Sequence, residues 1–133
     1  MNGKTVRDCA HEIPVLMECD VLVVGGGPAG MAAAVGAAQA GANTVIMEQY
    51  GCLGGNITLS AVEPPSWYRQ EKTTMPGGVG TEIEKRMIAL DAAVRTSFRP
   101  SVGYSYDTEV FKYMADQMIK DYRITPLYHC LGT

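Results

Sequence analysis

The sequence has few residues of the kinds that build metal sites or disulfide frameworks. Its 133 residues include four cysteines and two histidines. No two cysteines have the CxxC spacing, and the histidines do not complete a zinc-binding set. We therefore expect no metal site and no disulfide framework. The cysteines, Cys9, Cys19, Cys52 and Cys130, are expected to be reduced and mostly buried.

Positive charge and long apolar runs are scarce as well. Eleven Lys and Arg stand against 14 Asp and Glu, which gives a net charge of −3. Without a basic cluster, we expect no nucleic-acid partner. No apolar run approaches the ~20 residues that span a bilayer. Charged and polar residues run through Cys19, so the N-terminus lacks the form of a signal peptide. We expect no membrane span and a cytoplasmic location.

Glycine and small residues, in contrast, are plentiful between residues 20 and 49. The segment contains a strand-like run (21–24), a glycine turn (25–30), a helix-like stretch that stops at Gly41, a second apolar run (44–47) and an acid, Glu48. This order predicts a dinucleotide-binding βαβ unit in an α/β fold with parallel strands. A bare GxGxxG would be weak evidence, but here the whole unit agrees.

Each position in the turn has a physical role in this prediction. Gly25 allows the tight turn, Gly27 lets a pyrophosphate approach the backbone, and Gly30 lets the helix pack closely on the strands. Pro28 and Ala29 open the helix, whose free N–H groups and positive end attract phosphates.

Glu48 lies 23 residues after Gly25, where a carboxylate can accept hydrogen bonds from ribose hydroxyls. Gln49 follows it and is counted with the cofactor-binding residues. An acid that ends a strand and faces a ligand is not part of the core. We therefore expect the fold to survive the replacement Glu48→Leu.

A second glycine-rich loop, residues 50–58, follows the acid directly and reads YGCLGGNIT. With both loops, the chain resembles FAD-dependent oxidoreductases with a glutathione-reductase-type Rossmann domain. It is most similar to members with a YGxLGG loop, and fumarate-reductase-type flavoproteins are more distant kin. The resemblance implies that Glu48 binds the adenosine ribose of FAD, and that the second loop runs along the pyrophosphate toward the flavin. That role falls on Gly54, Gly55 and Asn56.

Cys52 departs from the pattern of this family, where a bulky apolar residue is expected. A small apolar filler explains it. Covalent attachment of the flavin, or redox exchange through its sulfur, is the alternative.

The resemblance also implies an incomplete Rossmann-like domain. We expect an arm at residues 1–19, which carries a solvated His11, and the N-terminal part of an FAD-binding domain at residues 20–133. Family members are longer, so a second polypeptide or a further C-terminal part should complete the site for the flavin and a small-molecule substrate. No catalytic residue is assigned. The alternatives are an NAD-binding reductase module and a non-catalytic assembly subunit that retains the fold.

The rest of the chain predicts fewer functional features. Residues 61–80 form an expected long loop, where Trp67, Tyr68 and Arg69 face the flavin or substrate, anchor the loop or meet another subunit. A capping box, with Thr81 at the N-cap and Glu84 reaching back, predicts a helix that ends near Ala92.

A second helix is expected at 108–122, with a core-facing stripe that includes Met114 and Met118. A strand is expected at 124–131. Pro126 places it at an edge or at a strand start. Within this strand, His129 has either a structural or a catalytic role.

Overall fold

The structure is a computed structural model that describes residues 14–65, 77–98 and 101–132. Residues 14–19 of the expected arm contain no helix or strand, and most of them are exposed. His11 lies outside the described residues, and so do Trp67, Tyr68 and Arg69.

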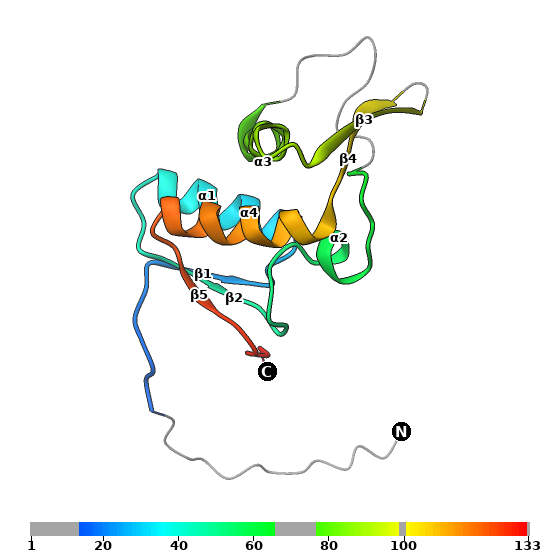
Figure 1. The fold of residues 1–133 in the computed structure, drawn as a ribbon. Coiled ribbons are helices and arrows are strands. Elements are labelled where there is room, and N and C mark those ends of the chain that lie inside the picture. The colour runs from blue at the N-terminus through cyan, green and yellow to red at the C-terminus, as the bar shows by residue number, and fades with distance from the viewer. Residues whose placement is uncertain (1–13, 66–76, 99–100, 133) are drawn as a thin grey trace, which may run out of the picture.

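A three-stranded parallel sheet forms the base of the molecule (Figure 1). Its strands are β1 (Val21–Val24), β2 (Thr44–Met47) and β5 (Thr125–Leu127), in the order β1-β2-β5. Two helices, α1 (Pro28–Gln39) and α4 (Thr108–Asp121), cover one face of this sheet. The parallel α/β architecture expected from the sequence is therefore confirmed.

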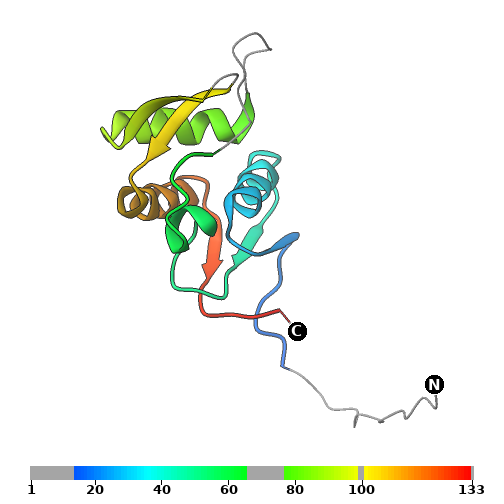
Figure 2. The ribbon, with the colours of Figure 1, turned by 90° about the vertical axis from the view of Figure 1, so that its right-hand side faces the viewer.

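A further layer lies on the other side of α1 and α4 from the sheet (Figure 2). It consists of helix α3 (Gly78–Ala89) and an antiparallel hairpin of β3 (Ala93–Phe98) and β4 (Ser101–Tyr106). The hairpin was not predicted. A short helix, α2 (Asn56–Leu59), occupies the end of the second glycine loop.

The core lies between the sheet and helices α1 and α4, and between these two helices and the layer of α3 and the hairpin. Met31 and Val35 of α1, Met87 of α3 and Phe111 of α4 are fully buried there. The stripe predicted for the last helix also includes Met114 and Met118, and both are buried. Helix α4 begins after Asp107, whose carboxylate accepts hydrogen bonds from the N–H groups of Glu109 and Val110.

The predicted capping box is wrong. Helix α3 begins at Gly78 after an N-cap at Gly77, so Thr81 lies inside the helix. The apolar stripe starts a turn earlier than predicted, because Val79 packs on the core four residues before Ile83. Tertiary packing thus overrides the cap signal. The Thr81 hydroxyl oxygen is instead buried, and among the described residues it has no hydrogen-bond partner. The helix ends at Ala89, three residues short of the predicted end.

The last predicted strand is also too long. Strand β5 stops at Leu127, and the chain then turns at His129, which has a φ of +56°. The N–H groups of His129 and Cys130 donate to the carbonyls of Tyr50 and Glu48, respectively. This segment therefore crosses the ends of the sheet instead of extending it. The predicted edge position of Pro126 is confirmed, because β5 pairs only with β2 among the described residues.

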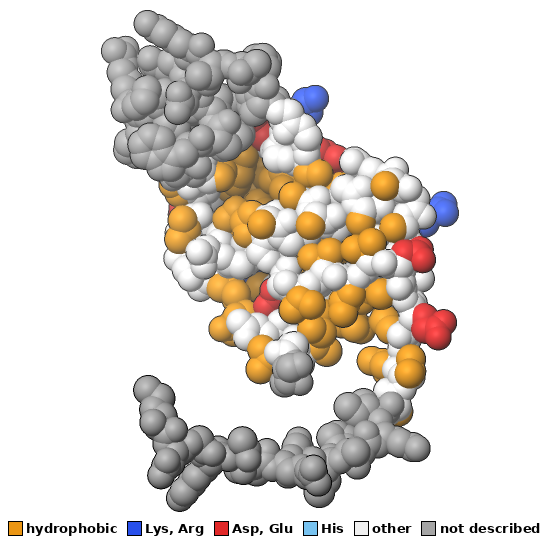
Figure 3. Space-filling view, turned by 180° about the vertical axis from the view of Figure 1, so that it is seen from behind, with side chains coloured by type: hydrophobic (Ala, Val, Ile, Leu, Met, Phe, Trp, Pro, Cys, Tyr) orange, Lys and Arg blue, Asp and Glu red, His pale blue; other side chains and the backbone are white. Residues whose placement is uncertain are grey.

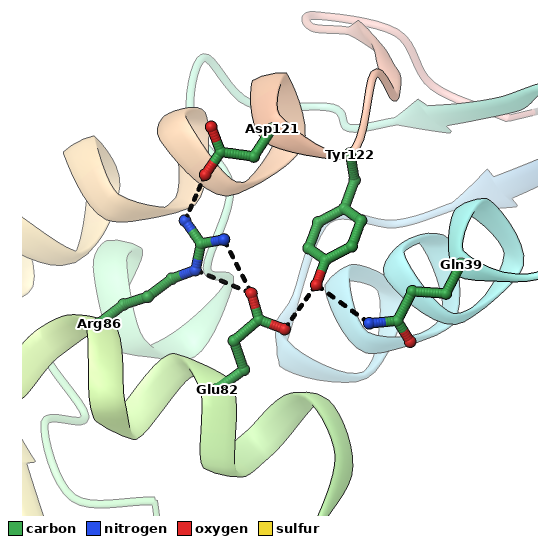
Figure 4. Close-up of polar contacts among 5 residues, drawn as sticks. All are labelled: Gln39, Glu82, Arg86, Asp121 and Tyr122. Carbon is green, nitrogen blue, oxygen red and sulfur yellow. Dashed lines mark hydrogen bonds and ion pairs between the residues drawn. The ribbon is translucent and has the colours of Figure 1, made fainter.

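A polar network joins α3 to the C-terminal ends of α1 and α4 (Figure 4). Its members are Gln39, Glu82, Arg86, Asp121 and Tyr122. The Arg86 guanidinium contacts Asp121 at 2.6 Å and Glu82 at 2.8 Å. Burial disfavours the charged guanidinium, but the hydrogen bonds to both carboxylates outweigh it and raise the pKa of Arg86. The network holds the outer layer against the two helices beneath it.

Tyr128 fixes the segment after β5 to α4, because its hydroxyl donates to the Asp116 carboxylate at 2.7 Å. Burial and this hydrogen bond raise the pKa of Tyr128 above its ordinary value of about 10. A pKa that folding raises contributes stability that is complete below pH ~10 and is lost as the pH rises through the folded value.

We expect Tyr128→Phe to be less stable than the parent near pH 8, and we expect this difference to shrink above pH 10. Urea unfolding at both pH values measures it. Tyr113→Phe removes the hydroxyl group of an exposed tyrosine on α4, and it controls for the loss of a tyrosine hydroxyl at the surface. A difference for Tyr128→Phe that is the same at both pH values would contradict the expectation.

Candidate cofactor site

The N-terminus of α1 is open to a ligand. Its N-cap is Gly27, no side chain caps it, and its first turn contains no acidic residue. The N–H of Met31 is the first to bond back, to the Gly27 carbonyl at 2.9 Å. The N-terminus of α4 differs, because the Asp107 carboxylate fills it. Free N–H groups and the positive end of the helix dipole make the start of α1 suited to an anion.

Gly25 and Gly30 have the roles in the turn that the sequence predicted. Gly25 has a φ of +102°, which L side chains rarely adopt. A Cβ on Gly30 would overlap the carbonyl oxygen of Gly25. The helix therefore packs against the turn at a distance that only glycine allows.

The two glycine loops touch one another directly. The N–H of Gly54 donates to the carbonyl of Gly26 at 2.8 Å. A Cβ on Gly55 would lie 2.9 Å from the Cα of Gly27, and Gly55 has a φ of +52°. The second loop is thus held beside the start of α1.

The expectation that Glu48 is not part of the core is wrong, because its side chain is buried. It is 6% exposed, and both carboxylate oxygens accept backbone hydrogen bonds. One bond comes from the N–H of Gly26 at 2.6 Å and the other from Tyr50 at 3.0 Å. The acid therefore joins the first glycine turn to the second loop. A carboxylate has about four acceptor positions, so ribose hydroxyls could still bind to it.

Gly26 was absent from the predicted site residues. It is buried, and a Cβ there would overlap the Leu53 side chain and lie 3.0 Å from a Glu48 oxygen. The run of three glycines was the signal that could have revealed it.

A hollow of about 190 Å³ lies at the carboxyl ends of the strands. It brings together three of the predicted residues, Gly25, Glu48 and Gln49. Sequence reasoning missed the rest of its lining, which comes from Val24, Met47 and the segment Cys130–Gly132. Ligands of parallel α/β sheets bind at this edge. No sequence signal indicated the segment after β5, which reaches the hollow because the chain turns after Leu127.

Asn56, Cys52 and His129 lie outside this hollow. Asn56 is exposed at the start of α2. The half-buried Cys52 thiol lies 3.8 Å from the Thr58 hydroxyl. His129 is exposed, and its ring lies beside Gly51. Cys52 and His129 line neither the hollow nor the start of α1.

The described residues contain neither a metal-binding cluster nor a membrane-spanning helix. No group of three or more His, Cys, Asp or Glu side chains is placed to hold a metal ion. In the same part of the chain, no helix is long and apolar enough to cross a membrane.

Residues 20–133 match the sequence profile of the family described as FAD dependent oxidoreductase. The chain belongs to this family. The predicted Rossmann-like fold and the predicted cofactor, FAD, are therefore confirmed. Between the FAD-binding and NAD-binding readings of the glycine turn, the match decides for FAD.

Curated relatives match this chain over a small part of their own length. A urocanate reductase of Eggerthella lenta is 39% identical over 71 residues, which are 51% of this chain and 11% of that protein. An NADH oxidase of Thermoanaerobacter brockii is 33% identical over 84 residues, which are 60% of this chain and 13% of the oxidase. The chain thus spans only a small part of the length of these relatives.

A solved structure supports the fold. The crystal structure of THI4 from Thermovibrio ammonificans aligns with 84% of this chain and 38% of its own length. The TM-score is 0.55 and the identity is 23%, so the likeness concerns the fold alone.

Proposed function

We propose that the chain binds the ADP half of FAD across the contact between its two glycine loops. The observation that carries this proposal is the uncapped start of α1, which lies beside the hydrogen bond between Gly54 and Gly26. The pyrophosphate would lie against this helix end and the adenosine in the hollow at the carboxyl ends of the strands. This placement agrees with the family of the chain.

The residues present fit such a ligand. A Cβ on Gly27 would meet only the Cα of Gly55, at 4.0 Å, so space is open where a phosphate would approach. Ala29 and Gly30 would donate first-turn N–H groups, while Pro28 has none to offer. Glu48 and Gln49 lie at the hollow, where the ribose would bind.

Gly54, Gly55 and Asn56 form the second part of the proposed site. Gly54 and Gly55 also have packing reasons to be glycine, since a Cβ on Gly54 would overlap Thr58. Their contribution to binding is to hold the second loop beside the pyrophosphate. Asn56 is exposed and free to reach a ligand that follows this loop.

We place this chain in a longer or multi-chain oxidoreductase that acts on a small molecule. In such an enzyme the flavin supplies the redox chemistry, and the protein binds and orients it. This chain would hold the dinucleotide end, and no general acid or base is assigned to it. A cytoplasmic location is part of the same proposal and rests on the sequence.

The partner in the proposal is further polypeptide, from the same gene or a second chain. Strand β1 pairs only with β2 among the described residues, which leaves its other edge open. Val23 packs under α1, so Leu22 and Val24 point to the opposite face, where they are 52% and 64% exposed. Apolar side chains gather on the face of the molecule seen in Figure 3, with few charged ones among them. Apolar surface of this kind marks an interaction site.

We expect the isolated chain to bind ADP and to bind FAD no more tightly than ADP, because walls for the flavin come from further sequence. Adding the partner chain, or extending this one, should raise the affinity for FAD and leave that for ADP nearly unchanged. Calorimetric titration with both ligands measures this. Tighter binding of FAD than of ADP by residues 1–133 alone would contradict the proposed partner. Absence of ADP binding in both forms would contradict the proposed site and favour a non-catalytic assembly subunit.

A further inference from the structure

The β3–β4 hairpin lies on the outside of the molecule, away from the parallel sheet (Figure 1), and has only two strands. Strand β4 has a contact on its outer side, because the N–H of Tyr106 donates to the Glu63 carbonyl at 3.3 Å. Strand β3 pairs only with β4 among the described residues, so its outer edge is open. An open edge presents unpaired N–H and C=O groups to a further strand.

The register of the hairpin shows which backbone groups point outward from β3. Ala93 is opposite Tyr106, whose N–H points away from β3. These two residues are therefore a non-hydrogen-bonded pair, and hydrogen-bonded and non-hydrogen-bonded pairs alternate along an antiparallel ladder. The N–H and C=O groups of Ala93 and Arg95 thus point outward, whereas those of Val94 point to β4.

The side chains along this edge are available for a contact. Val94 is 70% exposed. Asp91 and Arg95, which have opposite charges, are exposed as well, and neither forms an ion pair among the described residues. The other open edges are less suited to pairing with a copy of themselves. Strand β5 contains Pro126, which has no N–H to donate, and the open edge of β1 is the one proposed above for further polypeptide.

We propose that the open edge of β3 pairs antiparallel with the same edge of a second copy of the chain, around a twofold axis at Val94. This register places Ala93 of each copy opposite Arg95 of the other, so their outward N–H and C=O groups exchange hydrogen bonds. It also places the two Val94 side chains opposite one another. Arg95 of one copy lies near Asp91 of the other, and the twofold axis repeats this charge pair.

Other registers are less favourable. An axis at Arg95 would place two guanidinium groups opposite one another, and like charges directly opposite are destabilising. An axis at Ala93 would need Asp91 to continue the ladder, but Asp91 has a φ of +54° and is not extended. The axis at Val94 uses both outward residues and joins opposite charges. The edge is short, and interfaces below about 1,200 Å² are weak, so the copies should associate only at high protein concentration.

Amide hydrogen exchange in the full chain tests the proposal. When the protein concentration is raised into the millimolar range, we expect the amides of Ala93 and Arg95 to become protected. The Val94 amide, which already points to β4, should change little. A monomer at millimolar concentration would overturn the proposal, and so would association that leaves both amides unprotected. This surface lies apart from the glycine loops, so the binding of ADP is unaffected by either outcome.

A charge swap tests the register. Arg95→Asp and Asp91→Lys each replace the attractive charge pairs of the dimer by repulsive ones, so each variant alone should associate at least tenfold more weakly than the parent. A mixture of the two variants should form heterodimers with an affinity close to that of the parent, because every pair again has opposite signs. Sedimentation velocity measures both effects, and circular dichroism checks that the variants fold.

Arg123→Asp is the matched control, since it makes the same charge change at an exposed residue beyond the other end of α4. It should associate like the parent. Association of folded Arg95→Asp that equals the parent's, or a mixture that associates no better than the variants alone, would overturn the proposal. If either edge variant does not fold, the exchange of the Ala93 and Arg95 amides in the parent decides.

Discussion

Replacing Glu48 by leucine should destabilise the fold by several kcal/mol and also weaken the binding of ADP. The buried carboxylate accepts the N–H groups of Gly26 and Tyr50, and leucine would leave both donors without an acceptor. Each such loss costs about 1–3 kcal/mol, out of a total stability of roughly 5–15 kcal/mol for a domain. Because the acid joins the two glycine loops, their contact should loosen as well.

Glu48→Gln gives a graded comparison, since its side-chain amide keeps one acceptor oxygen and loses the other. We expect its free energy of unfolding to lie between those of the parent and Glu48→Leu, with at least a tenfold loss of affinity for ADP. Urea unfolding and ADP titration on the same samples separate the two effects. Parent-like stability of Glu48→Leu would show that the acid does not hold the loops together.

Alanine at position 30 should lower the stability of the fold much more than alanine at position 27, although both replace a glycine of the same turn. A Cβ on Gly30 would overlap the Gly25 carbonyl oxygen, so Gly30→Ala should cost about 1–3 kcal/mol of stability or more. A Cβ on Gly27 meets no atom closer than 4.0 Å, and Gly27 has a φ of −68° that alanine adopts. Gly27→Ala should therefore change stability by no more than about 1 kcal/mol.

The affinity for ADP should depend more strongly on position 27. The Cβ of Gly27→Ala would stand where the pyrophosphate approaches the backbone, so a folded variant should lose at least tenfold in affinity, which is about 1.4 kcal/mol. Gly27→Val, with a larger side chain, should block binding outright. Calorimetric titration with ADP measures the loss. Unchanged affinity of folded Gly27→Ala would place the pyrophosphate elsewhere.

Local signals account for the parts of the fold that the sequence could predict. The turn after β1 needs a residue with positive φ and another without a Cβ, and Gly25 and Gly30 meet these needs at fixed spacing. Helix α4 was predictable because its apolar residues recur at helical spacing. The edge position of Pro126 followed from its missing N–H.

Tertiary contacts decided what the sequence could not predict. The acceptor role of Glu48 depends on Gly26, which lies 22 residues earlier in the chain, and no local pattern indicates that pair. The segment Cys130–Gly132 enters the hollow only because the chain turns after Leu127. Thr81 resembled an N-cap, but the packing of Val79 extended the helix past it. Strand β3 has three polar residues in a row, Arg95, Thr96 and Ser97, so it lacks the alternation of apolar and polar residues that predicts a strand.

Amide chemical-shift mapping with ADP tests the central claim most directly, namely that two contacting glycine loops form one pyrophosphate site. We predict that the largest shifts on ADP binding fall at Gly27, Ala29 and Gly30 and, at the same ADP concentration, at residues 54–56. Phosphate alone should shift both groups less, since it lacks the adenosine contacts. Shifts confined to one loop, or centred on the capped start of α4, would contradict the claim.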